Sequence, residues 1–201
     1  MANLGISRVV IDLFVEDRAH EEFLRALLRR IAEEEGVRIT IRLRSGRGGH
    51  GRALSEFVLF QRVLLSQPEP PDIIVVCIDG NCQGLVRARN EISRHVEVSL
   101  RSRVVIACPN PHIERWYLAD PASFEHVVGS RPRLEARKCE RGLYKSRLIQ
   151  AVQDGGHPTT LGGIEFAQEI VDSMDLYRAG KNERSFHHFV EGARAMIRSL
   201  R

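Results

Sequence analysis

Long apolar runs are absent from the 201-residue sequence, and no stretch reaches the roughly 18 to 20 residues that a helix needs to cross a bilayer. The first residues also lack the basic and then apolar pattern of a signal peptide. We therefore expect a cytoplasmic protein with no membrane partner. With 43% hydrophobic and 28% charged residues, the composition excludes a disordered, collagenous or coiled-coil chain. It suits one compact domain, alone or with a small helical extension.

Cysteine and lysine are scarce. The four cysteines lack the paired C-x-x-C spacing of a zinc site, and Cys77 and Cys108 lie inside apolar, strand-like runs. We therefore expect reduced thiols in the core or at the surface. All but three of the 30 basic residues are arginine, but the net charge is only +4. Neither number by itself indicates a nucleic-acid partner.

Glycine-rich nucleotide motifs are absent as well. The first predicted strand is followed by E-D-R-A-H-E-E instead of a glycine-rich turn, and no G-x-x-x-x-G-K-[ST] loop is present. A dinucleotide fold and a phosphate-binding loop of that type are therefore disfavoured. A phospho-acceptor receiver domain is disfavoured because no Ser or Thr follows the fourth predicted strand and no later strand ends in lysine.

What the sequence does contain is an alternation of strand and helix patterns. Buried strands are expected over residues 7–16, 72–79 and 103–108, the second of them central, and an outer strand with one cationic face is expected over 37–44. The intervening segments have helical periodicity. The first helix follows an Asp17 N-cap and stops at Gly36, and the later ones cover the stretches 52–66, 85–98, a short helix from about 111, 143–153, 162–174 and 184–200.

This order predicts an α/β fold, a mainly parallel sheet flanked by helices. We place the α/β core at residues 1–128 and a basic linker with a helical C-terminal extension, packed on the core, at residues 129–201. Trp116, Tyr117 and Leu118 are expected in the core. Asp12, inside the first strand, is expected to face outward or to form a local ion pair.

Acidic side chains follow three predicted strands at their carboxyl ends. Glu16 ends the first, Asp79 and Asn81 end the third, and Glu114 comes soon after the fourth. Ligands of open parallel sheets bind at this edge, so these side chains are expected to meet there. Clustered carboxylates repel one another unless a cation intervenes, and oxygen ligands suit Mg²⁺ or Mn²⁺. The alternative for each acid is a helix cap or a solvent-facing residue.

Two basic segments are candidates for contact with a polyanion. Residues 38–52 contain five arginines and no acid, and residues 131–147 contain seven basic residues and two acids. The glycine loop in the first segment also offers backbone N–H groups to phosphate. The alternative for both segments is a solvated surface. The residues expected to contact phosphates are Arg42, Arg44, Arg47, His50, Arg52, Lys138 and Lys145.

Several motifs together resemble a known family. They are V-E-D-R-A-H-E-E-F-L, the basic glycine-containing loop, D-I-I-V-V-C-I-D-G-N and P-H-I-E-R-W-Y-L-A-D. This combination resembles the Toprim (topoisomerase-primase) domain, and most of all the small standalone Toprim-like proteins related to the overcoming-lysogenization-defect (OLD) nucleases. The likeness covers about residues 7 to 120. It implies a Toprim-like, Rossmann-like sheet and a divalent metal that serves phosphodiester cleavage or transfer.

The resemblance also implies roles for individual residues. Glu16 corresponds to the family glutamate, often assigned the general acid/base role, and Asp79 to the first aspartate of the D-x-D motif. Glu21 or Glu22 matches the acid that follows in the first helix. Glu114 lies in a stretch that is similar to the I-E-x-W-x-L-A-D signature of the standalone group.

The sequence departs from the family pattern at two positions. Asp17 stands where glycine is usual, and Asn81 replaces the second aspartate of D-x-D. An asparagine still offers a carbonyl oxygen to a metal, but it removes one negative charge, so metal affinity should fall. The predicted catalytic residues are Glu16, Asp79 and Glu114, and the predicted ligands of Mg²⁺ or Mn²⁺ are Glu16, Asp79 and Asn81.

The leading hypothesis is therefore a Mg²⁺- or Mn²⁺-dependent nuclease, or related phosphoryl-transfer enzyme, that acts on DNA or RNA in phage defence. The alternative is an inactive Toprim-like subunit that binds nucleic acid or a partner ATPase encoded nearby, which the asparagine at position 81 favours. A third interpretation, a small-molecule phosphatase or nucleotide-binding protein, fits the same acids but leaves the basic segments unexplained.

Overall fold

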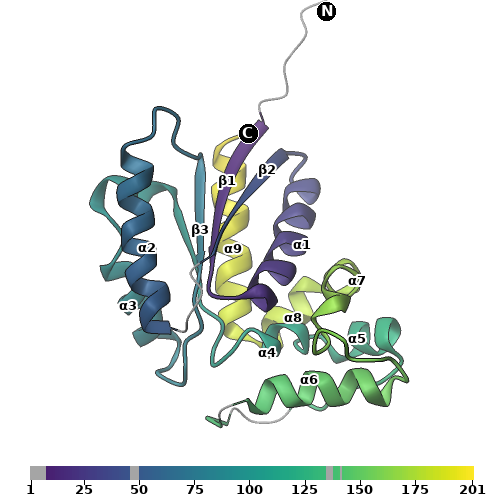
Figure 1. Cartoon of the computed structure of the whole chain (residues 1–201). Helices are drawn as coiled ribbons and strands as arrows, with labels where there is room; N and C mark the ends of the chain where they lie inside the picture. The colour runs from purple at the N-terminus through teal and green to yellow at the C-terminus, as the bar shows by residue number, and fades with distance from the viewer. Residues whose placement is uncertain (1–7, 46–49, 135–137, 141) are drawn as a thin grey trace, which may run out of the picture.

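Four parallel strands form a single sheet at the centre of the protein, in the order β2-β1-β3-β4 (Figure 1). The computed structural model describes residues 8–45, 50–134, 138–140 and 142–201. The predicted α/β class is confirmed, and the expected central strand, β3, lies between two others. The strands are β1 (Arg8–Val15), β2 (Arg38–Ser45), β3 (Ile73–Cys77) and β4 (Val104–Ala107).

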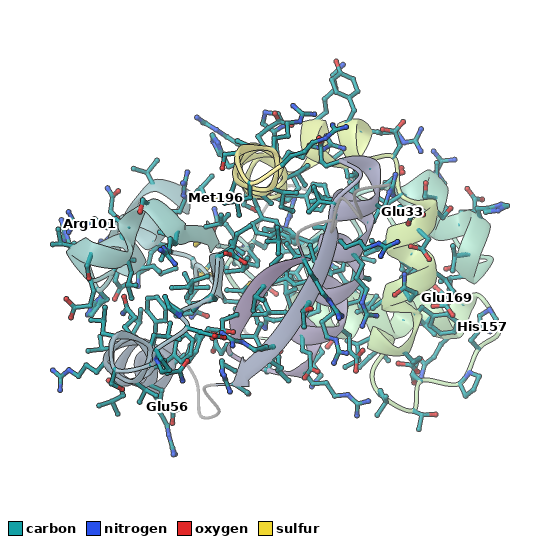
Figure 2. All side chains as sticks on the ribbon, turned by 90° about the horizontal axis from the view of Figure 1, so that it is seen from above. Glu33, Glu56, Arg101, His157, Glu169 and Met196 are labelled. Atoms are coloured by element: carbon teal, nitrogen blue, oxygen red, sulfur yellow. A yellow bond between two sulfur atoms is a disulfide. The ribbon has the colours of Figure 1, made fainter. Side chains whose placement is uncertain are left out.

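Helices cover both faces of this sheet, and further helices gather beyond its carboxyl end (Figure 1). The α-helices are α1 (Arg18–Glu34), α2 (His50–Leu65), α3 (Leu85–Arg94), α4 (Glu114–Tyr117), α5 (Pro121–Val128), α6 (Leu143–Asp154), α7 (Ala167–Ser173), α8 (Leu176–Asn182) and α9 (Arg184–Ser199). Two 3₁₀ turns are η1 (Val98–Arg103) and η2 (Ile164–Phe166). Figure 2 shows α9, with Met196, and α2, with Glu56, on opposite faces of the sheet.

The turn from β1 into α1 is fixed by the residues that the sequence offers there. Asp17 caps the helix as predicted, because its Oδ1 accepts hydrogen bonds from the N–H groups of Ala19 and His20 at 2.9 and 3.2 Å. The helix stops at Gly36, whose φ of 68° lies in the left-handed region that glycine adopts without strain. Both ends of α1 are thus set locally.

The core is divided by the sheet into two clusters of unequal size. The larger cluster lies between the sheet and α1, α9 and the helices beyond the carboxyl end, and it contains Trp116 and Tyr117 as expected. The smaller cluster lies under α2 and α3, with Phe14 and Phe57 among its members. Residues on both sides of position 128 belong to the larger cluster, and the boundary proposed there stays a prediction.

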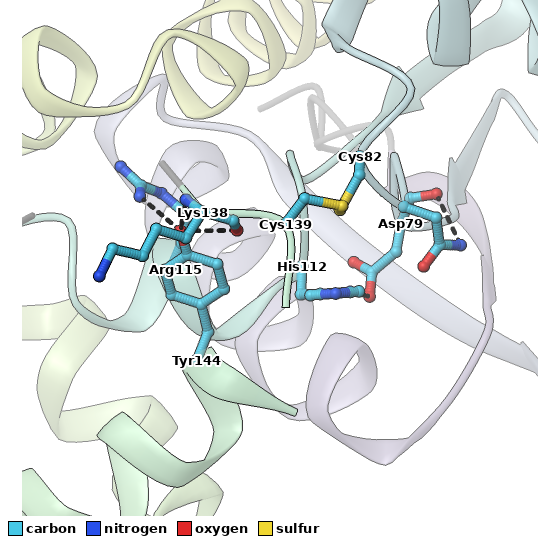
Figure 3. The surroundings of a disulfide bond; sticks show 8 residues. Asp79, Cys82, His112, Arg115, Lys138, Cys139 and Tyr144 are labelled. Atoms are coloured by element: carbon cyan, nitrogen blue, oxygen red, sulfur yellow. Dashed lines mark hydrogen bonds and ion pairs between the residues drawn. A yellow bond between two sulfur atoms is a disulfide. The ribbon is translucent and has the colours of Figure 1, made fainter. Parts of the chain in front are cut away.

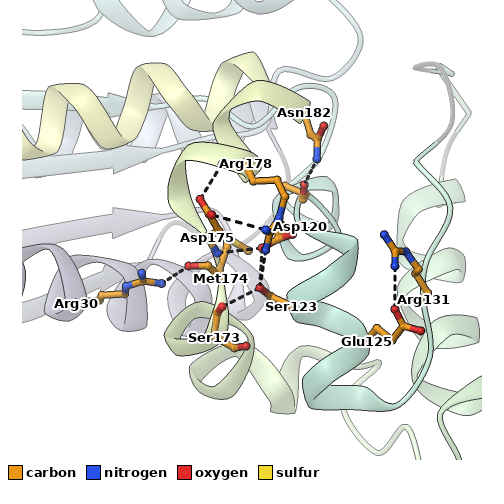
Figure 4. Close-up of polar contacts among 11 residues, drawn as sticks. Arg30, Asp120, Ser123, Glu125, Arg131, Ser173, Met174, Asp175, Arg178 and Asn182 are labelled. Carbon is orange, nitrogen blue, oxygen red and sulfur yellow. Dashed lines mark hydrogen bonds and ion pairs between the residues drawn. The ribbon is translucent and has the colours of Figure 1, made fainter.

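The buried carboxylate of Asp120, directly before α5, connects this part of the chain to α8 (Figure 4). Asp120, which is 1% exposed, accepts hydrogen bonds from Arg178 Nε at 2.6 Å and Nη2 at 2.7 Å, from Ser123 Oγ at 2.6 Å and from the N–H of Asp175 at 2.9 Å. Burial by itself raises the pKa of Asp120, but these donors outweigh it and hold that pKa at about 2.

Replacing Asp120 with asparagine is expected to lower the free energy of unfolding by about 2 kcal/mol, because the charge that strengthens these hydrogen bonds is removed. Since the folded pKa is depressed, this contribution is complete above the unfolded pKa, near pH 4, and is lost as the pH falls through about 2. Urea titrations of both proteins at pH 7 and pH 3 measure the difference.

The matched control is Glu125→Gln, because the pair of Glu125 with Arg131 is open to solvent on both sides (Figure 4). This substitution should change the free energy by less than about 0.5 kcal/mol. Equal effects of the two substitutions at pH 7 would show that the buried network stabilises nothing beyond a surface pair.

Candidate metal centre

Two acids from different strands meet at the carboxyl edge of the sheet. Glu16 directly follows β1, and Asp79 comes two residues after β3, which is paired with β1 in parallel. The buried His20, in the first turn of α1, completes a group of three. One ligand atom of each side chain lies within 4.8 Å of the other two. This is a possible metal-binding cluster of two carboxylates and an imidazole.

Asp79 is the centre of the hydrogen bonds in this cluster. Its Oδ1 lies 2.9 Å from His20 Nε2, and its Oδ2 lies 3.0 Å from His112 Nδ1. Its backbone N–H donates to Glu16 Oε2 at 3.3 Å. On the far side of the His20 ring, Nδ1 lies 2.7 Å from Asp17 Oδ1. The imidazole is thus held between two carboxylates, and both oxygens of Asp79 are oriented by histidines.

The charges of these groups shift one another's pKa values. Burial lowers the pKa of His20, but the charge of Asp79 and the hydrogen bonds to Asp17 and Asp79 raise it well above its ordinary value. Burial raises the pKa of Asp79, yet the charge of His20 and the hydrogen bonds from His112 and His20 hold it below the ordinary range. Burial, followed by the negative charge of Asp79, raises the pKa of Glu16. The two acids therefore repel each other, and a cation between them would relieve this repulsion.

The third predicted acid, Glu114, begins α4 and is partly buried. Burial raises its pKa, and the negative charge of Asp79 adds to the increase. Its carboxyl group therefore interacts electrostatically with Asp79, although Glu114 is not one of the three clustered residues. Glu21 and Glu22 form ion pairs with arginines four residues away on α1.

Asn81 is exposed, and its φ of 40° is unusual for a residue other than glycine. Its Nδ2 lies 3.5 Å from the backbone oxygen of Asp79, and its N–H donates to Pro111 O at 3.1 Å. Next to it, Gly80 donates its N–H to Pro109 O at 2.7 Å, and an added Cβ would lie 3.0 Å from that oxygen. A larger residue at position 80 would require the two loops to move apart by a few tenths of an ångström.

A family model for a domain of unknown function, DUF4276, matches residues 15–193. The chain belongs to the DUF4276 family. The matched part contains Glu16, His20, Asp79 and His112, so the whole cluster lies inside the DUF4276 domain. No curated protein and no solved structure matches the chain significantly. The family description names no activity and no Toprim relationship, so the resemblance to Toprim nucleases stays a prediction.

His20 and His112 of the DUF4276 site were not predicted from the sequence. A signal for His20 was present, because it stands on the apolar side of α1, next to Ala19 and one turn before Phe23 and Leu24, all of which are buried. A polar side chain on a buried helix face requires a partner. For His112 the sequence contains no such signal, since its contact with Asp79 depends on how two loops meet.

The basic residues predicted from the first segment lie on β2 and α2. Arg42 donates a hydrogen bond to the buried Asp12 of β1, and Arg44 Nε lies 3.7 Å from Asp12 Oδ2. The ion-pair interpretation of Asp12 is confirmed, and the outward-facing one is wrong. Arg52 Nε donates to Glu56 at 2.7 Å. All three arginines thus have acidic neighbours within the protein.

The remaining basic residues lie elsewhere or outside the described part of the chain. Lys138 donates its backbone N–H to the hydroxyl of Tyr144 at 2.9 Å, and Lys145 is exposed on α6. His50 is the first residue of α2, and its side chain lies outside the described part, as does the whole of Arg47. Their contact with phosphate stays a prediction.

The expectation of reduced thiols is wrong for two of the four cysteines. Cys82 and Cys139 form a disulfide bond between the loop after β3 and the basic stretch before α6 (Figure 3). The partners are 57 residues apart, so no local spacing indicated them. Cys77 and Cys108 are free and buried as expected. In the described part of the chain, no helix has the length and apolarity needed to cross a membrane.

Proposed function

We propose that this DUF4276 protein is a divalent-metal-dependent phosphodiesterase that cleaves nucleic acid, with Mg²⁺ or Mn²⁺ as its cofactor. The observation that carries the proposal is the meeting of Glu16, His20 and Asp79 at the carboxyl edge of a parallel sheet. Ligand sites of such sheets lie at this edge. The resemblance of the surrounding motifs to the standalone Toprim-like nucleases supports the same chemistry.

The donor atoms of this cluster fit a hard or borderline divalent cation. Glu16 and Asp79 offer carboxylate oxygens, which suit Mg²⁺ and Mn²⁺, and His20 adds an imidazole nitrogen. Because nitrogen ligands favour the later metal ions over Mg²⁺, Mn²⁺ is the better first probe of this site. Burial and then the negative charge of Asp79 raise the pKa of Glu16, and this repulsion between the two acids is a further reason to expect a cation here.

A divalent cation at this position would polarise a phosphodiester and lower the pKa of an attacking water. The protein's own groups would do the rest. Glu16, Asp79 and His20 Nε2 would bind the cation, the imidazole after it has lost its proton. Asp17 would then hold the ring of His20 in one orientation, and His112 would do the same for the carboxylate of Asp79. The pKa of Glu114 is raised toward neutral pH by burial and by the charge of Asp79, so this carboxyl group is suited to transfer a proton to or from the reacting phosphate.

One observation favours a second function, that of a non-catalytic subunit that binds nucleic acid or a partner ATPase. Asn81 stands where the resemblance calls for a second acid, and its side-chain Nδ2 is near the backbone of Asp79. A site with one negative charge fewer binds metal more weakly. A protein of this kind would keep nucleic-acid binding and show no metal-dependent cleavage.

Calorimetric titration with Mn²⁺ tests the proposed site directly. We expect the wild-type protein to bind Mn²⁺, and the Glu16→Gln variant to bind it roughly 10-fold more weakly or worse, because a charged ligand is removed. Glu33→Gln is the matched control, since Glu33 is exposed near the opposite end of α1 and should leave affinity unchanged (Figure 2). Absence of Mn²⁺ binding, or equal affinity of the wild-type protein and Glu16→Gln, would overturn the proposal.

A further inference from the structure

A basic groove of about 900 Å³ runs along α3 and the beginning of α9, beside the edge strand β4. We call it the α3–α9 groove. Its charged lining residues are Arg87, Arg89, Arg94 and Arg184, with His188 next to Arg184. None of these residues belongs to the two basic segments that the sequence analysis singled out.

The α3–α9 groove lacks acidic residues in its described lining. Within the described part of the chain, no carboxylate lies within 4.0 Å of its four arginines, in contrast to Arg42 and Arg52. Burial and the positive charges of Arg89 and Arg184 lower the pKa of His188, and Arg184 Nε donates to its Nε2 at 3.3 Å. The described lining of the groove is therefore positively charged, with no acidic side chain among its members.

The arrangement of the arginines fits several phosphates better than one. Arg87 and Arg94 are about two turns apart on α3, or roughly 10 Å along the helix axis. Arg184 contributes from a second helix. Gly84, the N-cap residue of α3, has no side chain to cap the helix, and it also lines the groove. The positive end of the helix dipole thus lies at one end of the groove.

The groove and the candidate metal centre share two loops. Gln83 and Gly84 line the groove, and the same loop contains Asp79. Asn110 lines it from the loop that also carries His112, the residue bonded to Asp79. A chain of phosphates that lies along α3 and continues past Gly84 would therefore approach the carboxyl edge of the sheet.

We propose that the α3–α9 groove binds the sugar-phosphate backbone of the nucleic acid that is cleaved at the candidate metal centre. This inference rests on the proposed function and deepens it, because it names the surface that holds the substrate. Arginine suits this role, since its guanidinium group binds phosphate in a bidentate manner.

Fluorescence anisotropy with a labelled single-stranded oligonucleotide, in EDTA and over a series of salt concentrations, tests the groove apart from the chemistry. The Arg89→Ala/Arg184→Ala variant should bind about 10-fold more weakly or worse. A plot of the logarithm of the binding constant against the logarithm of the salt concentration has a negative slope. The magnitude of this slope should decrease by roughly 0.7 for each phosphate that no longer has an arginine beside it. The variant Arg87→Ala/Arg94→Ala changes two exposed side chains of α3 and should act in the same direction.

The matched control is Arg8→Ala/Arg38→Ala, which removes the same charge from the amino ends of β1 and β2. It should bind the oligonucleotide nearly as the wild type does. Asp79→Asn separates the two proposals, because it should retain oligonucleotide binding and lose cleavage. If both groove variants bind as the wild type does, or the control weakens binding equally, the groove proposal is overturned while the cleavage result still decides the function. A wild-type protein that binds no oligonucleotide would also overturn it.

Discussion

Replacing Asp79 with asparagine is expected to lower metal-dependent cleavage of nucleic acid by about 10³-fold or more. Asp79 is a predicted metal ligand, and its carboxylate is hydrogen-bonded to His20 and His112. Loss of its negative charge would therefore weaken both metal binding and these two hydrogen bonds. Metal-assisted stabilisation of a phosphoryl transition state is worth several kcal/mol, and each ~1.4 kcal/mol is tenfold in rate. Cleavage of a labelled oligonucleotide in the presence of Mn²⁺ gives both rates.

This result needs a check on folding, because Asp79 is nearly buried and its replacement leaves His20 with one carboxylate partner fewer. Circular dichroism and oligonucleotide binding in EDTA should both match the wild type within a few-fold. Glu33→Gln, far from the cluster on α1, should cleave at the wild-type rate. Wild-type cleavage by a folded Asp79→Asn protein would remove this cluster as the reaction site.

Replacing both Cys82 and Cys139 with serine is expected to lower the free energy of unfolding by about 4 kcal/mol. The disulfide closes a loop with a sequence separation of 57 residues, and the chain-entropy model gives about that value for such a loop. The effect arises mainly in the unfolded chain, whose conformational entropy increases when the disulfide is removed. Urea titrations of the oxidised wild type and the double variant measure the difference.

Two controls belong to this measurement. The reduced wild-type protein should unfold at the same urea concentration as the double variant. Unreduced protein that has been denatured should expose two reactive thiols, those of Cys77 and Cys108. Four reactive thiols in that sample would show that the disulfide does not form.

Much of the sheet could be predicted, because its strands are specified by local apolar patterns. β3 is buried along its whole length and is a continuous apolar run, whereas β2 alternates and lies at an edge. The helical part was predicted less well. The expected helix over 162–174 is a 3₁₀ turn followed by the shorter α7, and α8 was not expected at all. Pairs such as Asp120 with Arg178 set these short helices, and such pairs have no local pattern.

The candidate site shows the same division. The approach of Glu16 to Asp79 could be predicted, because parallel strands end at one edge. His112 and the Cys82–Cys139 bond could not, because they depend on loops that meet only in the folded chain. The α3–α9 groove escaped notice for a similar reason, since its arginines are thinly spread along the sequence and gather through the packing of two distant helices.

The unequal division of the core has a consequence for how the chain opens locally. Helices α2 and α3 pack on the smaller apolar cluster, so their detachment exposes less apolar surface and costs less free energy than that of α1 and α9. The backbone amides of α2 and α3 should therefore exchange with solvent sooner than those of α1 and α9. A polyanion along the α3–α9 groove would connect this weaker layer to α9 in the stronger one. Bound nucleic acid would then connect the two layers and make the protein more rigid.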